Sequence, residues 1–340
     1  MKISVIIPVY NAARTINKTI GAILSLVEAN PAVEIIAVDD GSIDATPEIL
    51  KTFKQIKTIR QENSGPAAAR NTGAKAAAGE ILVFTDSDTI PEAKWLFQLT
   101  RPFENPEIMA TTGTYSIANP NSPLAEIIQK EISNKHASYD EFIKFGGTYN
   151  LAIRRSLFQK IGGFNEGYRR ASGEDNDLCY RILREGYLLK FVPQAIVAHY
   201  HPENPVKYMK EQFRHGFWRA KLYIDHPTRI AGDNYTGIRE LIETSSSLFC
   251  LAALVFSIFK SARKNFLFKA ASLLVLLLLT ATEMVMALKI TFKPGKSLFA
   301  TAVFVARSFA RTAGFLAGLQ FFALKKTTGL KTLPNSEKEQ

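Results

Sequence analysis

The stretch EILVFTDSD, residues 80–88, joins an apolar run to two acids. Its first six residues have the composition expected of a strand buried on both faces of a sheet. Similar runs precede it, ISVII at 3–7 and EIIAV at 34–38. Helical patterns lie between the runs, with apolar side chains along one face of 16–27 and a proline at the first helical position of 46–48. This alternation predicts an α/β domain with a mostly parallel, Rossmann-like sheet covered by helices.

Polar residues follow the first two predicted strands, at the carboxyl ends where such sheets bind ligands. Pro8-Val9-Tyr10-Asn11 follows the first strand and Asp39-Asp40-Gly41-Ser42 follows the second. The two acids could accept hydrogen bonds from a nucleobase N–H and from ribose hydroxyls, or they could form a turn with a helix cap. After Gly65 an alanine-rich helix opens, where Arg70 could reach a nucleotide, hold the acidic loop or serve packing alone.

The acids that close the quoted stretch, Asp86 and Asp88, are separated by one residue at the end of a predicted strand. Two carboxylates in this position can point toward one divalent cation, which can bridge the phosphates of a diphosphate leaving group. The Asp-x-Asp pattern is common in proteins. It gains weight here because it follows a buried strand and a preceding acid pair.

Glycine-rich and acidic motifs continue farther along the chain. Gly147 and Asn150, in the motif Gly146-Gly147-Thr148-Tyr149-Asn150, are candidate acceptor-binding residues. Gly173-Glu174-Asp175 begins an amphipathic helix. The helix dipole stabilises carboxylates at this end as anions, which suits a base that must be ionised at neutral pH. The same acids also make good helix caps, so both interpretations stay open.

The formal net charge of +11 is concentrated in the last hundred residues, which carry 13 Lys/Arg and 4 Asp/Glu. The same region contains apolar stretches at 245–259, 266–288 and 298–324. The second has the length of a bilayer span, whereas the other two could lie in the membrane interface. A buried helical domain without a membrane is the alternative. We expect anionic membrane lipids, and no nucleic acid, as the partner of this charge.

These features predict a catalytic domain over 1–240, transmembrane or interfacial helices over 241–330 and a disordered tail over 331–340. The two cysteines, Cys179 and Cys250, offer no disulfide framework and fit a reducing compartment. The N-terminus has no signal-peptide pattern. The predicted location is therefore the cell membrane, with the catalytic domain facing the cytoplasm.

Roughly the first 200 residues resemble family 2 of the inverting glycosyltransferases, which have the GT-A type of nucleotide-sugar fold. Each motif is weak alone, but their order and spacing together are specific. The motifs that carry the resemblance are Pro8-Val9-Tyr10-Asn11, Val38-Asp39-Asp40-Gly41-Ser42, Arg70-Asn71-Thr72-Gly73, Asp86-Ser87-Asp88, Gly162-Gly163-Phe164 and Glu174-Asp175.

The resemblance implies a role for each motif. Asp175, with Glu174 beside it, would deprotonate the acceptor hydroxyl. Asp86 and Asp88 would hold a divalent metal, Mn²⁺ or Mg²⁺. The nucleotide-sugar donor would be bound by Pro8, Tyr10, Asn11, Asp39, Asp40, Gly65, Arg70 and Asp86.

A histidine after the apolar run 195–198 can complete the metal site in similar enzymes, and His199 is the candidate. His201 and His215 are rivals, and a solvated loop histidine is the plain alternative. Processive synthases of the family have a Gln-x-x-Arg-Trp motif that Gln212-Phe213-Arg214-His215 does not match. This departure argues against processive polymer synthesis.

The reaction that the resemblance implies is a single displacement at the anomeric carbon, with inversion and without a covalent enzyme intermediate. A basic, apolar tail favours a lipid-linked or cell-envelope glycan acceptor. One alternative is a sugar-1-phosphate nucleotidyltransferase, but its glycine-rich, lysine-bearing loop is missing where Pro8-Val9-Tyr10-Asn11 stands. Another is a membrane scaffold that has lost catalysis, although Asp88, Glu174 and Asp175 are all present.

Overall fold

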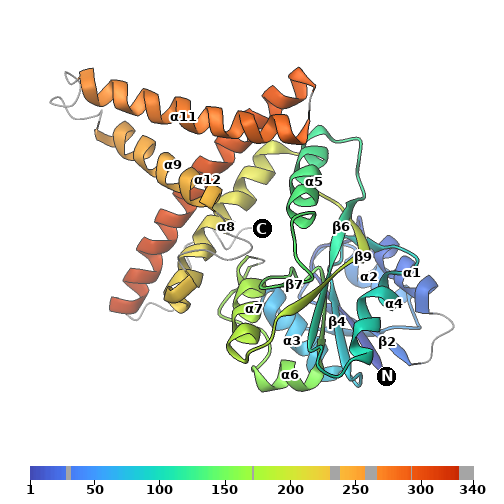
Figure 1. Cartoon of the computed structure of the whole chain (residues 1–340). Coiled ribbons are helices and arrows are strands. Elements are labelled where there is room, and N and C mark those ends of the chain that lie inside the picture. Colours follow the sequence, from blue (N-terminus) through green and yellow to red (C-terminus); the bar gives the residue numbers. More distant parts are fainter. Residues whose placement is uncertain (28–31, 171, 230–237, 257–265, 292, 329–340) are drawn as a thin grey trace. The chain divides into compact units, whose positions relative to one another are not determined.

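The computed structural model of the chain describes residues 1–27, 32–170, 172–229, 238–256, 266–291 and 293–328 (Figure 1). It divides into two compact units at Asn204–Pro205. We call the part up to Asn204 the site unit and the part from Pro205 onward the helical unit. The functional boundary that the sequence places near residue 240 stays a prediction. The predicted disorder of 331–340 lies outside the described residues.

The site unit alternates strands and helices in the order that the sequence predicts. Its strands are β1 (Ile3–Val9), β2 (Val33–Asp39), β3 (Lys57–Arg60), β4 (Ile81–Thr85), β5 (Thr89–Pro91), β6 (Ala110–Ile117), β7 (Phe142–Ile143), β8 (Asn150–Arg154) and β9 (Leu189–His199). Its helices are α1 (Ile16–Val27), α2 (Thr46–Thr52), α3 (Pro66–Ala76), α4 (Trp95–Thr100), η1 (Arg101–Glu104), α5 (Pro123–His136), α6 (Arg155–Lys160) and α7 (Glu174–Arg184).

The strands form one sheet in the order β3-β2-β1-β4-β8-β6-β9-β5, with β7 paired to β9. The first four strands are parallel, as predicted. Beyond β4 the sheet is mixed, because β8 runs antiparallel to both β4 and β6. Strand β9 returns parallel to β6 and pairs with the short β5, which directly follows the Asp86–Asp88 turn.

Each face of the sheet carries its own apolar core. Successive side chains of a strand point to opposite faces, so Val5 and Ile7 of β1 pack with α1, α2 and α4, whereas Ile6 packs with α3, α6 and α7. Figure 1 shows these two helical layers on either side of the sheet. The close approach of α3 depends on Gly73, because a Cβ there would come within 2.5 Å of the Ile6 side chain.

The helical unit contains α8 (Pro205–Asp225), η2 (Pro227–Arg229), α9 (Ile238–Phe256), α11 (Phe266–Ile290) and α12 (Pro294–Thr328). Helices α8 and α12 lie backbone to backbone, since added Cβ atoms at Gly216, Gly314 and Gly318 would collide with carbonyl oxygens of the facing helix. Gly314 and Gly318 form a G-x-x-x-G spacing, which permits such contact between helices.

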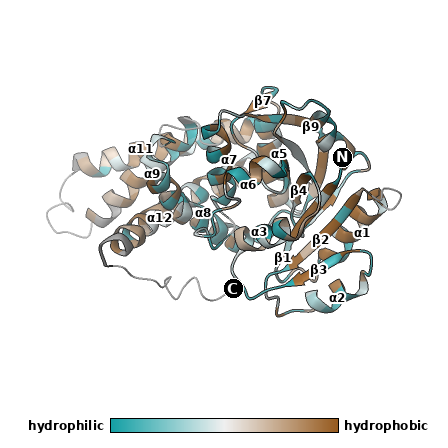
Figure 2. Cartoon of the chain, turned by 90° about the horizontal axis from the view of Figure 1, so that it is seen from below, coloured by the Kyte–Doolittle hydropathy of each residue, from teal (hydrophilic) through white to brown (hydrophobic). Residues whose placement is uncertain are grey.

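Two helices of this unit are long and apolar enough to cross a membrane, within Phe268–Ile290 and Pro294–Leu324. Only 17% of the first window is buried, so α11 is not the core helix of a globular domain. Figure 2 shows hydrophobic residues, coloured brown, along the C-terminal helices and also in the strands of the sheet. The apolar stretch predicted at 245–259 lies mostly in α9, and residues 257–259 fall outside the described ranges.

A charged network joins three helices inside the helical unit. Arg239 of α9 contacts Glu283 of α11 at 2.6 Å and Glu243 of its own helix at 2.7 Å. Arg307 of α12 lies 3.8 Å from Glu243. Both glutamates and Arg307 are buried. Two arginines therefore neutralise two glutamates, as buried charges require.

Candidate functional site

Arg70 connects three motifs that lie far apart in the sequence. It sits on α3, is buried, and donates from Nη1 to Glu174 Oε1 at 3.0 Å and from Nη2 to Asp86 Oδ1 at 2.8 Å. Burial opposes the guanidinium charge, but the carboxylates of Asp86 and Glu174 outweigh it and raise the pKa of Arg70. The two acids keep a net negative charge even after pairing with this one cation.

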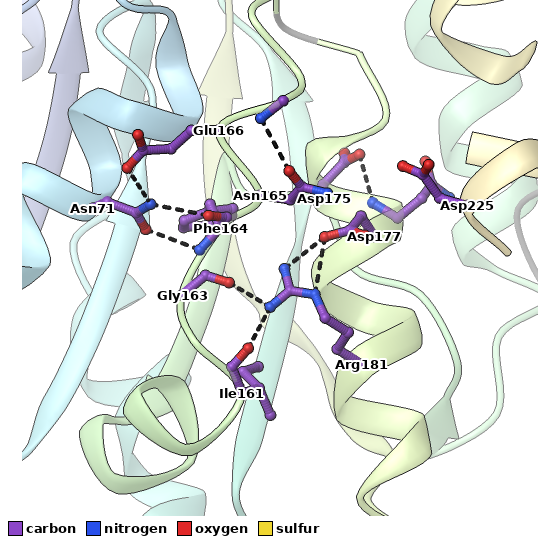
Figure 3. A network of polar contacts seen from close by, with 12 residues as sticks. Asn71, Ile161, Gly163, Phe164, Asn165, Glu166, Asp175, Asp177, Arg181 and Asp225 are labelled. Carbon is purple, nitrogen blue, oxygen red and sulfur yellow. Dashed lines mark hydrogen bonds and ion pairs between the residues drawn. The ribbon is translucent and has the colours of Figure 1, made fainter. Parts of the chain in front are cut away.

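The loop before α7 is fixed to α3 by Asn71. The Asn71 side chain donates to the Phe164 carbonyl at 2.9 Å and accepts from its N–H at 2.8 Å, as Figure 3 shows. It also donates to Glu166 at 2.9 Å. Gly163 has φ +69°, and a Cβ there would come within 2.7 Å of Asn71 Oδ1. These contacts explain why Arg-Asn-Thr-Gly and Gly-Gly-Phe occur together in one chain.

A second arginine fixes the same loop from the side of α7. Arg181 forms a fork with Asp177 at 2.6 and 2.9 Å and donates to the carbonyls of Ile161 and Gly163 (Figure 3). One planar guanidinium thus donates hydrogen bonds to a carboxylate of α7 and to two backbone carbonyls of the loop. The start of α7 is thereby positioned relative to the sheet.

Asp39 and Asp40 are both buried and both bonded to protein groups. Asp39 accepts from the Ser42 N–H and from Arg60 Nη1, each at 2.9 Å. Asp40 accepts from Gln61 Nε2 at 2.7 Å and from two backbone N–H groups, those of Ser64 and Gly65. The acid pair thus shapes the turn after β2 and the loop before α3. Direct contact of either carboxylate with a base or ribose stays a prediction.

The motif after β1 forms the facing loop. Pro8 lies inside the strand, opposite Val38 of β2 and beyond the residues of β1 that pair with β4. Asn11 has φ +48°, and its side chain accepts from the Ile43 N–H at 2.9 Å. Its own N–H donates to Ser42 Oγ at 2.9 Å. Tyr10 is exposed beside this cross-linked loop.

Asp88 and His199 meet because β5 pairs with β9. Thr89 lies opposite His199, and His199 Nε2 is 3.4 Å from Asp88 Oδ1. The turn before β5 is held by the Thr89 hydroxyl, which donates to the Asp86 carbonyl at 2.8 Å. Asp86 points instead to Arg70.

The pair Asp88 and His199 fits a divalent cation. Two ligands bound about 2.1 Å from one ion and near right angles to each other lie about 3 Å apart. The observed 3.4 Å is close to that separation. His199 Nδ1 is buried and has no hydrogen-bond partner in the described part of the chain. No group of three or more potential His, Cys, Asp or Glu ligands is assembled among the described residues, so this pair would need ligands from elsewhere.

The rival histidines have other contacts. His201 Nε2 lies 2.8 Å from Gln129 Oε1, and its backbone N–H donates to Asn119. Burial, followed by the charge of His199, lowers the pKa of His201 to about 3, so its ring is neutral at physiological pH. His215 belongs to α8 of the helical unit. Among these three histidines, it is His199 whose ring contacts Asp88.

Asp175 occupies the first turn of α7 and is half-buried. One of its oxygens accepts from the Asn176 N–H at 2.8 Å. Glu174, one residue earlier, is bonded to Arg70 and to the Ser172 N–H. The buried Glu174 carboxylate therefore holds the helix start in place, whereas Asp175 is the more accessible of the two acids.

Asn150 has a role in the scaffold. Its side chain is fully buried, accepts from Trp95 Nε1 at 2.8 Å and donates to the carbonyls of Thr114 and Ala195. The Asn150 side chain thus links Trp95 of α4 to β6 and β9, and the acceptor binding that the sequence suggests for Asn150 stays a prediction. Gly147 leaves room for the ring of Tyr149, which a Cβ would overlap.

The motifs do not reveal Tyr115 of β6, whose ring lies beside that of His199 in the structure. Its ring stacks on Tyr149, with centroids 3.5 Å apart. Burial, then the charges of Tyr149, Asp86, Asp88 and Asp175, raise the pKa of Tyr115 well above 10. The three carboxylates that the sequence assigns to metal and base therefore act on one phenol. A tyrosine in an ordinary strand gives no motif by which it could be found.

Comparisons with known proteins concern the family and the fold of the chain. The family model described as "Glycosyl transferase family 2" matches residues 4–162, and "N-terminal domain of galactosyltransferase" matches 128–204. A solved structure, the mannosyltransferase PcManGT from Pyrobaculum calidifontis in complex with GDP-Man and Mn²⁺, aligns with 97% of this chain and 88% of its own. The TM-score is 0.54 and the sequence identity 18%, so this likeness concerns the fold.

Two curated relatives extend the comparison. Glycosyltransferase AglE of Haloferax volcanii is 31% identical over 229 residues, which are 65% of this chain and 74% of AglE. Pre-mycofactocin glycosyltransferase of Mycobacterium tuberculosis is 29% identical over 246 residues. That match takes in 67% of this chain and 49% of the mycobacterial protein, so the chain spans about half of its length.

Proposed function

This chain belongs to family 2 of the glycosyltransferases, and we propose that it transfers a sugar from a UDP- or GDP-sugar to an acceptor hydroxyl with inversion at the anomeric carbon. The observation that carries the proposal is that Arg70 bonds both Asp86, in the turn after β4, and Glu174, at the start of α7, which brings the proposed metal side and base side of the site together. A leaving-group site and a base site must lie within one sugar of each other for a single displacement.

The donor would lie along the carboxyl ends of β1, β2 and β4. The exposed Tyr10 and the loops fixed by Asp39 and Asp40 border this edge. Asp88 and His199 would hold Mn²⁺ or Mg²⁺, which when bound neutralises charge on the departing diphosphate. The Mn²⁺ in the PcManGT complex is in keeping with this assignment. Asp86 would contribute through its pair with Arg70.

Asp175 would take the proton from the acceptor hydroxyl. It stands at the amino end of α7, where the helix dipole favours the ionised carboxylate. Glu174 and Arg70 hold that helix end by a buried pair of 3.0 Å. A base whose helix is fixed in this way needs little reorganisation when the acceptor arrives.

The acceptor would be lipid-linked or a cell-envelope glycan, reached from the membrane. The two helices that could span a bilayer and the basic C-terminal region support attachment to anionic lipids. In this proposal the site unit faces the cytoplasm, where nucleotide-sugars are available.

The purified full-length protein in detergent should be screened against UDP-glucose, UDP-N-acetylglucosamine, UDP-galactose and GDP-mannose with Mn²⁺ or Mg²⁺. We expect metal-dependent release of UDP or GDP from one donor, which a coupled assay detects. NMR of a transferred product should show a β linkage from an α-linked donor. Retention of configuration would contradict the single displacement, and no release from any donor would contradict the transferase assignment.

A further inference from the structure

Tyr115 is held rigidly by other rings of the site unit. It lies in β6 and stacks on Tyr149, with an interplanar angle of 18° and centroids 3.5 Å apart. His199 is tilted against it at 5.0 Å, and His201 meets it edge-on at 5.9 Å. Rings packed on several sides leave the phenol little freedom to rotate. The direction of the Tyr115 hydroxyl is therefore set by the fold.

The Tyr115 hydroxyl has no protein partner in the described part of the chain. The backbone carbonyl of Tyr115 accepts from Gln129 Nε2 at 3.0 Å, but Oη takes part in no hydrogen bond there. The residue is half-buried, and its ring centroid lies 5.0 Å from that of His199, whose Nε2 is 3.4 Å from Asp88. Burial, and after it the charges of Asp86, Asp88 and Asp175 among others, raises the pKa of its phenol. The Tyr115 hydroxyl is therefore available to a ligand that enters this part of the site.

The chemistry of these groups selects one kind of ligand. A phenol at neutral pH carries one O–H donor, and ionised carboxylates only accept hydrogen bonds. A hydroxyl placed between them satisfies both sides, because its oxygen accepts from the phenol while its proton goes to a carboxylate. A phosphate oxygen cannot satisfy both sides, since an ionised phosphate has no proton to give to a carboxylate. Sugar hydroxyls have the required character.

We propose that Tyr115 is a specificity-determining residue whose Oη donates a hydrogen bond to a hydroxyl of the transferred sugar, between Asp88 and Asp175. This proposal rests on the proposed function, because it places the sugar between the diphosphate side and the base side of that site. Tyr149 then acts as a positioning residue that holds the Tyr115 ring, and Gly147 provides the space for Tyr149.

The test compares donors with and without the sugar. Tyr115→Phe keeps the ring and its stacking but removes the hydroxyl. Binding of UDP-glucose, UDP-N-acetylglucosamine and GDP-mannose, with UDP and GDP as sugar-free counterparts, is measured by calorimetry in Mn²⁺ on the full-length protein. For the donor that wild type binds, we expect Tyr115→Phe to weaken affinity by about 3- to 10-fold, the usual effect of one neutral hydrogen bond. Affinity for the matching nucleoside diphosphate should be unchanged.

A matched control is Tyr187→Phe, because Tyr187 is also half-buried but packs on the core near α7. It should change neither affinity. Equal losses for sugar and sugar-free ligands in Tyr115→Phe, or no loss for either, would overturn the role of Tyr115 while leaving the transferase intact. Failure of wild type to bind or cleave every donor would overturn the proposed function itself. Thermal unfolding of both variants checks that the fold is kept.

Discussion

The two units each contain a buried group of charged side chains, and the two groups differ in charge balance. In the helical unit, Arg239 and Arg307 face Glu243 and Glu283, so the network closes on itself. In the site unit, one buried arginine faces Asp86 and Glu174, with Asp88 and Asp175 nearby and more exposed. The first network can hold helices together but has no charge left for a ligand. In the second, four carboxylates are grouped around one buried arginine, an excess of negative charge that suits the binding of a cation and the uptake of a proton.

The sharpest test of this difference is to remove the negative charge of Asp175 without changing the size of its side chain. Asp175→Asn should keep donor and metal affinity but lower transfer by about 10² to 10⁴, since the amide cannot accept the acceptor's proton. Transfer and nucleoside diphosphate affinity are measured on the same preparation. Glu174→Gln is the companion variant, and its main effect should be on stability, because Glu174 is paired with Arg70. If Asp175→Asn lost donor affinity and kept transfer at saturating donor, Asp175 would be a cap only.

Breaking the closed network should instead destabilise the helical unit. Glu283→Ala leaves Arg239 with Glu243 alone and makes the network net positive, which should cost about 3–5 kcal/mol of unfolding free energy. Thermal unfolding in detergent micelles measures the loss. Replacing the pair together, Arg239→Met with Glu283→Leu, should recover much of it, because no charge on either side is left without its partner.

An outcome in which Glu283→Ala unfolds normally but loses sugar transfer would overturn the contrast between the two networks. Glu283 would then be required for sugar transfer and not for the stability of the helical unit. Equal stability of the single and the double variant would show that the charges act independently of each other.

Removal of one proposed metal ligand should have an intermediate effect. His199→Ala takes away a ring whose Nε2 lies 3.4 Å from Asp88, so the Mn²⁺ concentration needed for half-maximal activity should rise about 10- to 100-fold. Mn²⁺ titration by calorimetry gives the same quantity without turnover. His201→Asn is the control, and it should lower stability through its contact with Gln129 while the metal requirement is kept. An unchanged requirement in His199→Ala would show that His199 is not a metal ligand.

The sequence predicts the parts of the fold that depend on local pattern. The first, second and fourth strands are continuous apolar runs because both their faces are covered, and the starts of α2, α3 and α7 follow from proline and acid positions. The sequence did not predict that β8 lies antiparallel between β4 and β6, since this pairing depends on residues far away in the chain. The sequence therefore suggests a more uniformly parallel sheet than the chain forms.

The candidate site was predictable where acids follow strands and not where its residues lie within strands. Asp88 and Asp175 stand in loops or at a helix start, and motif order identified them. Tyr115 and Asn150 belong to β6 and β8, and their surroundings are set by neighbouring strands. Sequence alone therefore did not single out the tyrosine. It also could not show that the Asn150 side chain bonds Trp95 and two backbone carbonyls, and the ligand-binding role it suggests for Asn150 stays a prediction.

The smallest expected difference between the units is their response to acid. In the site unit, burial alone would raise the pKa of Asp44, but hydrogen bonds from Thr46 and Ala13 outweigh it and lower the pKa below the usual 3.8. A lowered folded-state pKa contributes stability above pH 3.8 that is lost as pH falls through the folded value. In the helical unit, burial raises the pKa of Glu243 above the usual 4.5 despite Arg307 and Arg239. Its folded state then binds the proton more tightly, so stability is gained as pH falls toward 4.5.

Thermal unfolding from pH 7 to pH 3 can separate these opposite signs. Asp44→Asn should flatten the loss of stability below pH 3.8, because the amide does not titrate. Glu243→Gln should remove the gain that wild type shows as pH falls toward 4.5, since the side chain is then neutral at every pH. Both effects should be small, as one carboxyl contributes each, so each variant is compared with wild type at every pH. If Glu243→Gln instead removed a loss on acidification, the pairs with Arg239 and Arg307 would dominate over burial, and the closed network would be held by its charges in the same way as the site.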